Sequence, residues 1–420
     1  GSGHSNTLIG ATAGDNITTG DSNIIIGNGI DAASATADNQ LNIGGYIVGD
    51  HDVHGSKALY GTPGANRNMV INGAMNVAQR ATSLADIGAS GGYFTCDRWD
   101  IYAEATAGRL TSSQTSDGPN GISANCLKFD CTTADTSIAA SESLILRHKF
   151  EGQNVQRIGK GVAGAKQVTV SFYVKASAAF TFACNLIDND NNRQITKLFD
   201  TTTGWARHEL TYAADVDDGS SPFDDDNAVS LSLQFWLHAG ANYTGGTLQT
   251  TWANYVANTT AAGIDSFFSS TDNNFFLTGV QMEVGPVASP FEHEQISETL
   301  AKCQRYYVRY AGASGATHKR FGNGASATTT VSDILIALPC EMRDTPAIVT
   351  TGTASDYATY HANTVTANSV LPAINTAHDA GVGNLVSLDV TVGSGLTVGQ
   401  GAQLLANNST STYLAFDAEL

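Results

Sequence analysis

Apolar residues alternate with polar ones through the middle of this chain, which is the pattern of half-buried β-strands. The stretch VTVSFYVKAS places Val168, Val170, Phe172 and Val174 on one face. AFTFACNLID and AVSLSLQFWLHAG alternate in the same way, and turn-forming residues separate them. Many short alternating strands joined by turns predict an antiparallel β-sandwich, which we place at residues 92–291.

Residues 1–61 carry a different pattern, a short apolar strand that ends in glycine and returns at a fixed interval. SNTLIG, SNIIIG and NQLNIG end at Gly10, Gly27 and Gly44, which are 17 residues apart, and KALYG places Gly61 on the same interval. One such strand cannot bury its own apolar face, so it must stack on copies of itself. We expect an interwoven, β-helical or β-prism stem built from three chains, the smallest number that closes around an axis. A solenoid within one chain and a chance repeat are the alternatives.

The remaining segments predict a linker, one helix and a second β domain. Residues 62–91 begin with TPGANRNMVINGA, whose Pro, Gly and Asn residues indicate a hinge. The stretch EHEQISETLAKCQ, residues 292–304, has apolar residues at helical spacing and acidic residues in its early turns, so it predicts a short connecting helix. Residues 305–420 alternate again and predict a small C-terminal β-sandwich tip. The predicted fold class is all-β.

Composition and charge narrow the classes of partner. The chain has 21 Lys and Arg residues against 39 Asp and Glu, a formal net charge of −18 at pH 7. No lysine or arginine precedes Lys57 and none follows Arg343, so both ends are acidic. This distribution argues against binding to nucleic acid or to an anionic membrane. No stretch approaches the roughly 20 apolar residues that span a bilayer, so we expect no membrane insertion.

Catalytic chemistry finds little support in the sequence. The chain has no G-x-S-x-G, H-E-x-x-H, P-loop or dinucleotide-binding motif. Its six cysteines show no C-x-x-C spacing, so we expect buried free thiols rather than a zinc knuckle or a redox pair. We therefore expect a protein that is not an enzyme and that requires no cofactor.

Three motifs together resemble a family of phage tail-fibre and receptor-binding proteins. They are NRNMVINGAMNVAQRAT with CDRWDIY, FFLTGVQMEVGPVASPFE, and LAKCQRYYVRY, in this order. The resemblance covers residues 1–310 and implies a trimeric β stem and a carbohydrate-binding jelly roll. It also implies a place at the distal end of a virion's tail fibre, with other phage tail proteins at its N-terminal end. The implied function is adhesion to a bacterial surface receptor, a glycan or an outer-membrane receptor; a purely structural fibre segment or a polysaccharide-degrading tailspike are the alternatives.

The polar faces of the predicted strands supply candidates for a glycan platform. A tryptophan opposite the core face is unusual, because exposing its surface forfeits about 2–3 kcal/mol of burial. Such a ring stacks on the apolar face of a sugar, while amides and carboxylates bind the hydroxyls. The alternative is that this face is covered by a neighbouring subunit or by the segment that holds Trp252 and Tyr255. The candidates are Trp236, Gln234, His238, Tyr173, Gln281 and Glu283.

The tip and one acidic loop supply the other candidates. Two tip stretches, THKRFG and DYATYH, bring basic and aromatic residues together in expected loops, where such residues make adaptable contact surfaces. We expect His318, Lys319, Arg320, Tyr357, Tyr360 and His361 to contact the receptor. In the acidic stretch DNDNN the oxygen ligands alternate as in calcium loops. A structural Ca²⁺ is therefore a candidate ligand of Asp188, Asp190 and Asn192.

Overall fold

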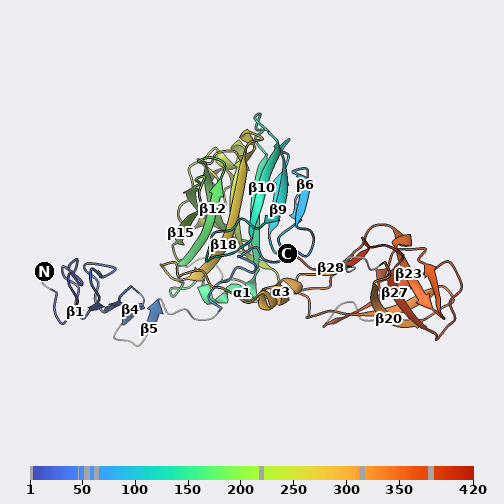
Figure 1. Ribbon diagram of the computed structural model, residues 1–420. Helices are drawn as coiled ribbons and strands as arrows, with labels where there is room; N and C mark the ends of the chain where they lie inside the picture. Colours follow the sequence, from blue (N-terminus) through green and yellow to red (C-terminus); the bar gives the residue numbers. More distant parts are fainter. Residues whose placement is uncertain are drawn as a thin grey trace.

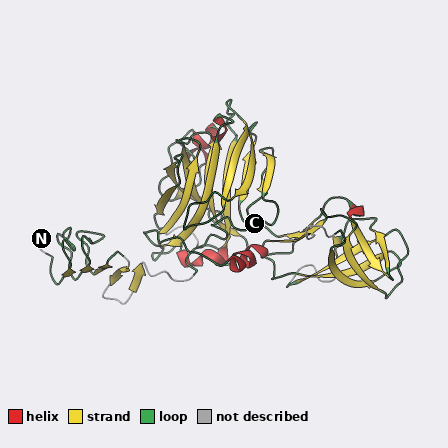
Figure 2. Ribbon diagram, in the orientation of Figure 1, coloured by secondary structure: helices red, strands yellow, loops and turns green. Residues whose placement is uncertain are grey.

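The structure is a computed structural model that describes residues 3–45, 47–51, 57–60, 66–216, 222–311, 317–376 and 383–420. Strands dominate these residues, and the helices among them are short (Figure 2). The strands form five sheets in three bodies: a stem, a central sandwich and a C-terminal tip (Figure 1). The predicted all-β class is confirmed.

The stem begins with three parallel strands, β1 (Thr7–Ile9), β2 (Ile24–Ile26) and β3 (Gln40–Ile43). Thr7 pairs with Ile24 and Ile24 with Leu41, so each turn of the chain advances by the predicted 17 residues. The repeated glycine has a steric reason. A Cβ on Gly10 would lie 2.3 Å from the carbonyl oxygen of Gly27, and the φ of Gly10 is 130°.

The 17-residue repeat ends after the third strand. Gly44 and Gly45 both adopt left-handed backbone, with φ of 63° and 73°, and they turn the chain back on itself. The next strands, β4 (Ile47–His51) and β5 (Lys57–Tyr60), therefore pair antiparallel. The prediction of a fourth repeat through KALYG is wrong for β5, and Gly61 itself lies outside the described residues, as do residues 62–65 of the predicted linker.

The central sandwich consists of two sheets whose described strand pairs are all antiparallel. In order across it, the six-stranded sheet contains β15 (Ala206–Tyr212), β12 (Val168–Ala176), β18 (Asn274–Val284), β10 (Cys126–Thr133), β9 (Arg109–Thr115) and β6 (Ser83–Ile87). The seven-stranded sheet contains β17 (Ala253–Asn254), β14 (Arg193–Asp200), β13 (Thr181–Asp188), β16 (Val229–Ala239), β11 (Ser143–Glu151), β8 (Asp100–Glu104) and β7 (Gly92–Tyr93). Short helical turns connect them: α1 (Gly152–Val155), η1 (Gln156–Ile158), α2 (Ala241–Thr244), η2 (Ala257–Thr259) and η3 (Phe267–Ser269).

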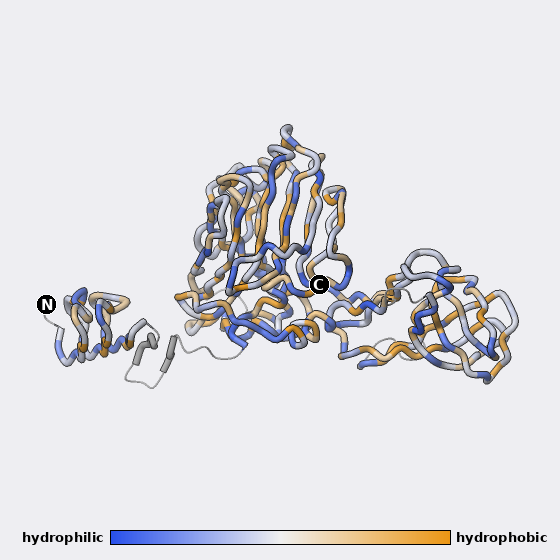
Figure 3. Tube along the Cα trace, viewed as in Figure 1, coloured by the Kyte–Doolittle hydropathy of each residue, from blue (hydrophilic) through white to orange (hydrophobic). Residues whose placement is uncertain are grey.

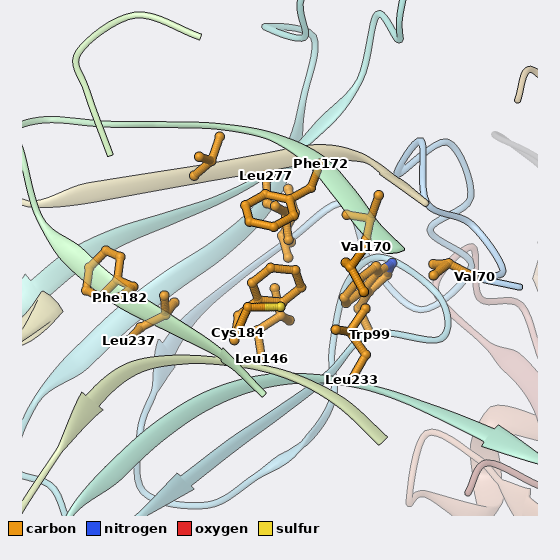
Figure 4. Packing of buried hydrophobic residues seen from close by; sticks show 14 of the residues in the cluster. Val70, Trp99, Leu146, Val170, Phe172, Phe182, Cys184, Leu233, Leu237 and Leu277 are labelled. Atoms are coloured by element: carbon orange, nitrogen blue, oxygen red, sulfur yellow. The ribbon is translucent and has the colours of Figure 1, made fainter. Parts of the chain in front are cut away.

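The inward faces of the two sheets form the main core, as the alternation predicts. Figure 3 shows hydrophobic and hydrophilic residues alternating along the strands. Figure 4 shows Phe172 and Leu277 of one sheet above Leu146 and Leu233 of the other. The rings of Phe172 and Phe235, both fully buried, meet edge to face with centroids 5.0 Å apart. The sandwich or jelly-roll interpretation of this region is confirmed.

The sandwich begins earlier than the predicted boundary at residue 92. The Met69 amide donates to the Met282 carbonyl at 2.9 Å, and the Trp99 indole donates to the Asn72 carbonyl at 3.2 Å. Met75 is fully buried in the core. Residues 66–91 therefore belong to the sandwich instead of forming a free linker.

The predicted connecting helix is present but shorter, as α3 (Ile296–Gln304). Glu292 does not enter it, because its two carboxylate oxygens accept hydrogen bonds from the backbone amides that precede the sandwich strands. The donors are Asn66 at 2.7 Å and Asn68 at 2.8 Å. The Glu292 amide in turn donates to Gln281 at 2.8 Å. These bonds keep Glu292 out of the helix, and Gln295, which directly precedes α3, has an extended backbone.

The tip has its own core between a three-stranded and a seven-stranded sheet. Ile334, Leu388 and Phe416 are fully buried in it. The smaller sheet contains β19 (Tyr307–Ala311), β28 (Tyr413–Asp417) and β22 (Ala347–Val349). The larger contains β24 (Thr364–Ala367), β23 (Tyr357–His361), β27 (Gly401–Ala406), β20 (Arg320–Ser326), β21 (Val331–Ala337), β26 (Leu385–Thr391) and β25 (Ala373–Ile374), and η4 (Ala354–Asp356) precedes β23.

The last residues of the tip return to the sandwich (Figure 1). Glu419 forms an ion pair with the fully buried Arg98, and Arg80 pairs with Asp417 at 2.9 Å. Lys149 donates to the carbonyl oxygen of Leu420 at 2.5 Å. Ion pairs, the one at Arg98 fully buried on the arginine side, thus join the C-terminal residues to the sandwich. The sequence pattern does not predict this contact between distant residues.

Two simpler predictions concern thiols and membranes. All six cysteines are free, five of them are buried, and Cys340 is partly buried, which confirms the prediction of free thiols. Within the described ranges, no helix has the length and apolar character needed to cross a membrane.

Candidate functional site

Trp236 does not form an exposed platform, because its side chain is buried. It lies on the outer face of β16 and is 2% exposed. Residues 241–264 of the same chain cross this face, and Tyr243 packs on the indole with ring centroids 5.1 Å apart. The indole nitrogen donates to Gln234, which is itself buried. The interpretation of Trp236 and Gln234 as an open sugar-stacking surface is therefore corrected.

The cover comes from the same chain, although Trp252 does not lie over the indole. Ala261 and Ile264 complete the cluster around Trp236. Trp252 packs instead against the main core and donates to the Ala213 carbonyl at 2.8 Å. Of the alternatives drawn from the sequence, the one that the structure supports is cover by the segment after β16.

His238 points to the opposite side of its sheet from Trp236. The pairing of β11 with β16 shifts register between Leu144 and Ile145, so a bulge turns His238 inward. Its ring lies 5.3 Å from that of Phe268, and it is fully buried. Burial lowers the pKa of this imidazole, and this effect outweighs the hydrogen bond to Glu142, which raises the pKa. His238 therefore cannot contribute to a platform with Trp236.

Gln281 and Glu283 use their polar atoms inside the chain. Both are buried, and Gln281 donates to Glu283 at 2.8 Å. Glu283 accepts the Ser289 amide at 2.8 Å and the Ser289 hydroxyl at 2.6 Å. These contacts hold the segment after β18 against the sheet, so the prediction that the two side chains bind sugar hydroxyls is corrected.

A row of partly exposed side chains crosses the outer face of the six-stranded sheet, and the sequence prediction missed it. We call Trp205, Lys175, Phe276 and Lys128 the aromatic row. Lys175 and Lys128 are the cross-strand partners of Phe276 on its two sides. The rings of Trp205 and Phe276 lie 6.3 Å apart, and the Lys175 ammonium lies 4.5 Å from the Phe276 centroid. Tyr173, the platform candidate that stays partly exposed, lies two residues before Lys175 on the same face of β12.

The aromatic row combines ring surface with charged groups. Asp117 pairs with Lys175 at 2.6 Å, and its backbone carbonyl accepts the Trp205 indole at 3.0 Å. Ring faces bordered by ammonium and carboxylate groups are suited to a ligand with both apolar and hydroxylated surface. The available signal was the pair Phe275–Phe276, in which strand alternation sends one ring to the core and the other outward.

The structure divides the predicted tip residues. Tyr357 is fully buried, donates its hydroxyl to the Tyr413 carbonyl at 2.5 Å, and has its pKa raised by burial. His361 is also buried, and Lys319 is partly buried. Tyr357 and His361 are therefore corrected from contact residues to tip-core and strand-packing residues, since they lie in β23 rather than in a loop.

The other tip candidates form a surface that we call the tip patch: His318, Arg320, Asn323, Tyr360 and Gln403. The Arg320 guanidinium lies 5.9 Å from the Tyr360 ring centroid. Gln403 is the cross-strand partner of both Tyr360 and Asn323, and its amide nitrogen donates to Asn323 at 2.9 Å. The Oε1 atom of Gln403 is buried beneath the surface, without a hydrogen-bond partner among the described residues. The patch therefore offers an aromatic ring and a guanidinium side by side.

The acidic loop does not assemble the predicted calcium ligands. Asp188 is fully buried, pairs with the buried Lys160, and accepts the Asn191 amide at 3.0 Å. Asp190 is exposed and accepts the Asp224 amide at 3.0 Å, while Asn192 takes the left-handed turn position with φ of 52°. Asp188, Asp190 and Asn192 serve a turn, a loop contact and an internal ion pair, so the calcium prediction finds no support in this geometry.

Comparison with known proteins gives similarities of structure alone. No protein-family model matches the chain, and no curated protein matches it. About half of the chain is similar to solved carbohydrate-binding modules. One, described as CBM4 structure and function, has 11% identity and a TM-score of 0.27 over 51% of this chain and 99% of its own. TmCBM61 in complex with β-1,4-galactotriose has 11% identity and a TM-score of 0.26 over 52% and 99%. A family 11 module of a Clostridium thermocellum cellulase has 14% identity and a TM-score of 0.24 over 47% and 91%. Scores this low assign no ligand to this chain.

Proposed function

We propose that this chain is the distal part of a homotrimeric phage tail fibre that adheres to a glycan on the bacterial surface. In this proposal the chain is part of the virion, its stem continues toward other tail proteins, and it acts by binding without catalysis. The observation that carries the proposal is the stem, whose parallel strands have apolar side chains on both faces.

One face of the stem is buried at its middle strand, while Leu8 of β1, on the same face, is 43% exposed. Ile25 is fully buried against Ala13 and Ala32. Because side chains alternate along a strand, Ile24 and Ile26 point the other way, and Ile26 continues the column of Ile9. Ile9 is 56% exposed. We call Ile9, Ile26 and Ile43 the outer column. An exposed apolar column of this kind needs an apolar surface to pack against, and copies of the same repeat around a threefold axis provide such a surface with the same spacing.

We expect Ile26→Lys to separate the chains and weaken adhesion to cells. A lysine in the outer column places a charge at the interface, and a single chain loses the avidity of linked sites, a factor of about 10²–10⁴. The measurement is retention of fluorescently labelled protein on a panel of bacteria, with circular dichroism to check folding. The matched control is Thr36→Lys, at an exposed stem position outside the strands. Equal retention of the two variants contradicts a role for the outer column.

The tip patch is the surface that we expect to contact the glycan. Tyr360→Ala removes its ring, and we expect an adhesion loss of about tenfold or more, with a stability change of only about 1 kcal/mol. Val370→Ala, at a tip position 54% exposed, is the control and leaves adhesion unchanged. Soluble polysaccharide from a bound strain competes with the intact protein, and no reducing ends are released.

The same assay separates the alternatives. Loss of adhesion in Trp205→Ala, but not in Tyr360→Ala, moves the contact to the aromatic row. Intact adhesion in both variants, or no adhesion of the unmodified protein to any strain, favours a purely structural fibre segment. Release of reducing ends establishes a tailspike and contradicts the proposal.

A further inference from the structure

Three buried side chains with metal-binding atoms meet at one end of the sandwich. Asp135 follows β10, Glu142 precedes β11, and His238 lies near the end of β16. Their candidate ligand atoms, two carboxylate oxygens and one imidazole nitrogen, all lie within 4.8 Å of one another. The residues are 5%, 4% and 0% exposed. This trio, which we call the Asp135–Glu142–His238 cluster, belongs to neither of the candidate binding surfaces.

The described residues bring little positive charge to the cluster. No lysine or arginine among them forms an ion pair with Asp135 or Glu142, and the ion pair that is present joins Glu142 to the His238 Nε2 atom at 3.2 Å. An imidazole brings at most one positive charge to two carboxylates. Buried carboxylates are ordinarily paired with cations or bound to metals, because an isolated buried charge is costly. A divalent cation balances the two carboxylates.

Neighbouring groups orient the ligands as they do around bound metals. The other imidazole nitrogen of His238, Nδ1, lies 2.8 Å from the Ser266 hydroxyl, which leaves Nε2 directed at the carboxylates. Asp135 accepts the Thr106 hydroxyl at 3.0 Å and the Ala107 amide at 2.8 Å. Hydrogen bonds of this kind fix the ring and the carboxylate of metal ligands in position.

We propose that the Asp135–Glu142–His238 cluster binds one structural divalent transition ion, with zinc as its best match. Imidazole suits zinc, whereas Ca²⁺ takes six to eight oxygen ligands. Zinc binds nitrogen and carboxylate oxygen at about 2.0–2.2 Å and accepts four ligands, so small rotations of the three side chains and one water complete its coordination. The ion joins the β10–β11 connection to the inward bulge of β16.

The test is zinc binding by the full chain without an affinity tag. The protein is stripped of metal with a chelator and dialysed against micromolar zinc. Its metal content is then measured by inductively coupled plasma mass spectrometry. We expect one zinc per chain and a rise in the melting temperature on zinc addition. Both effects disappear in His238→Gln and Asp135→Asn, which are nearly isosteric, and affinity falls about 10–100-fold in Ser266→Ala. His318→Gln, at an exposed tip histidine, keeps the full zinc content.

Several results overturn the assignment. Folded, stripped protein that takes up no zinc shows that the cluster is a hydrogen-bond network alone. Retention of zinc by both His238→Gln and Asp135→Asn places the ion elsewhere. Calcium that competes equally with zinc contradicts a transition-ion site. Circular dichroism of each stripped variant distinguishes lost binding from lost folding.

Discussion

Glu419→Gln should lower the free energy of unfolding of the sandwich by about 3–5 kcal/mol, because it removes the counter-ion of a buried arginine. Arg98 has a fully buried side chain, and Glu419 is the carboxylate that pairs with it among the described residues. Arg98 also donates to the Lys149 carbonyl at 2.7 Å and lies over the Tyr306 ring, so it has no route to water. All four tryptophans lie within residues 99–252, so urea unfolding followed by tryptophan fluorescence reports on the sandwich.

The control is an equivalent amide substitution at an exposed ion pair. Asp344 lies 3.8 Å from Arg343 and has a side chain that is 60% exposed. Asp344→Asn should change stability by no more than about 1 kcal/mol. If Glu419→Gln costs no more than this control, the C-terminal contact does not hold the tip to the sandwich.

Trp236→Ala should destabilise the sandwich by about 3–5 kcal/mol, since it leaves a cavity between β16 and the segment that covers it. The indole contacts Tyr243 and lies in a cluster with Ile145 and Ala183. Trp205→Ala, which removes a partly exposed ring of the aromatic row, should cost only about 1 kcal/mol. The measurement is the free energy of unfolding of the two variants, determined by urea unfolding under the same conditions.

The pair also separates two roles for Trp236. If the ring serves the fold, Trp236→Ala lowers the stability of the protein, whereas Trp236→Phe largely preserves it. In both variants the folded fraction then adheres as well as the unmodified chain. A Trp236→Ala variant as stable as the unmodified chain, but without adhesion, contradicts the buried position and restores the sugar-stacking interpretation.

The sequence predicted features that repeat locally. The alternation that placed Val170 and Phe172 inward, and the glycine interval from Gly10 to Gly27, both depend on neighbours along the strand. These patterns identified the sandwich and the parallel stem. The double glycine at Gly44 and Gly45 was a signal for the turn that ends the repeat. The prediction missed this signal because Gly61 follows Gly44 at the interval of the repeat.

The sites depended on contacts between distant residues, which alternation does not encode. Trp236 alternates outward as predicted, but residues 241–264, which follow no regular period, fold back over it. His238 left the predicted face because of one bulge in β16. Asp135, Glu142 and His238 span about a hundred residues without a recognisable spacing, so the fold itself is needed to bring them together.

The direct test of the central claim is the mass of the intact chain in solution. One chain weighs 43.7 kDa. If the outer column of the stem joins three copies, light scattering at micromolar concentration gives three times this mass for the unmodified chain, and the mass of one chain for folded Ile26→Lys. A single-chain mass for the unmodified protein contradicts the trimeric fibre.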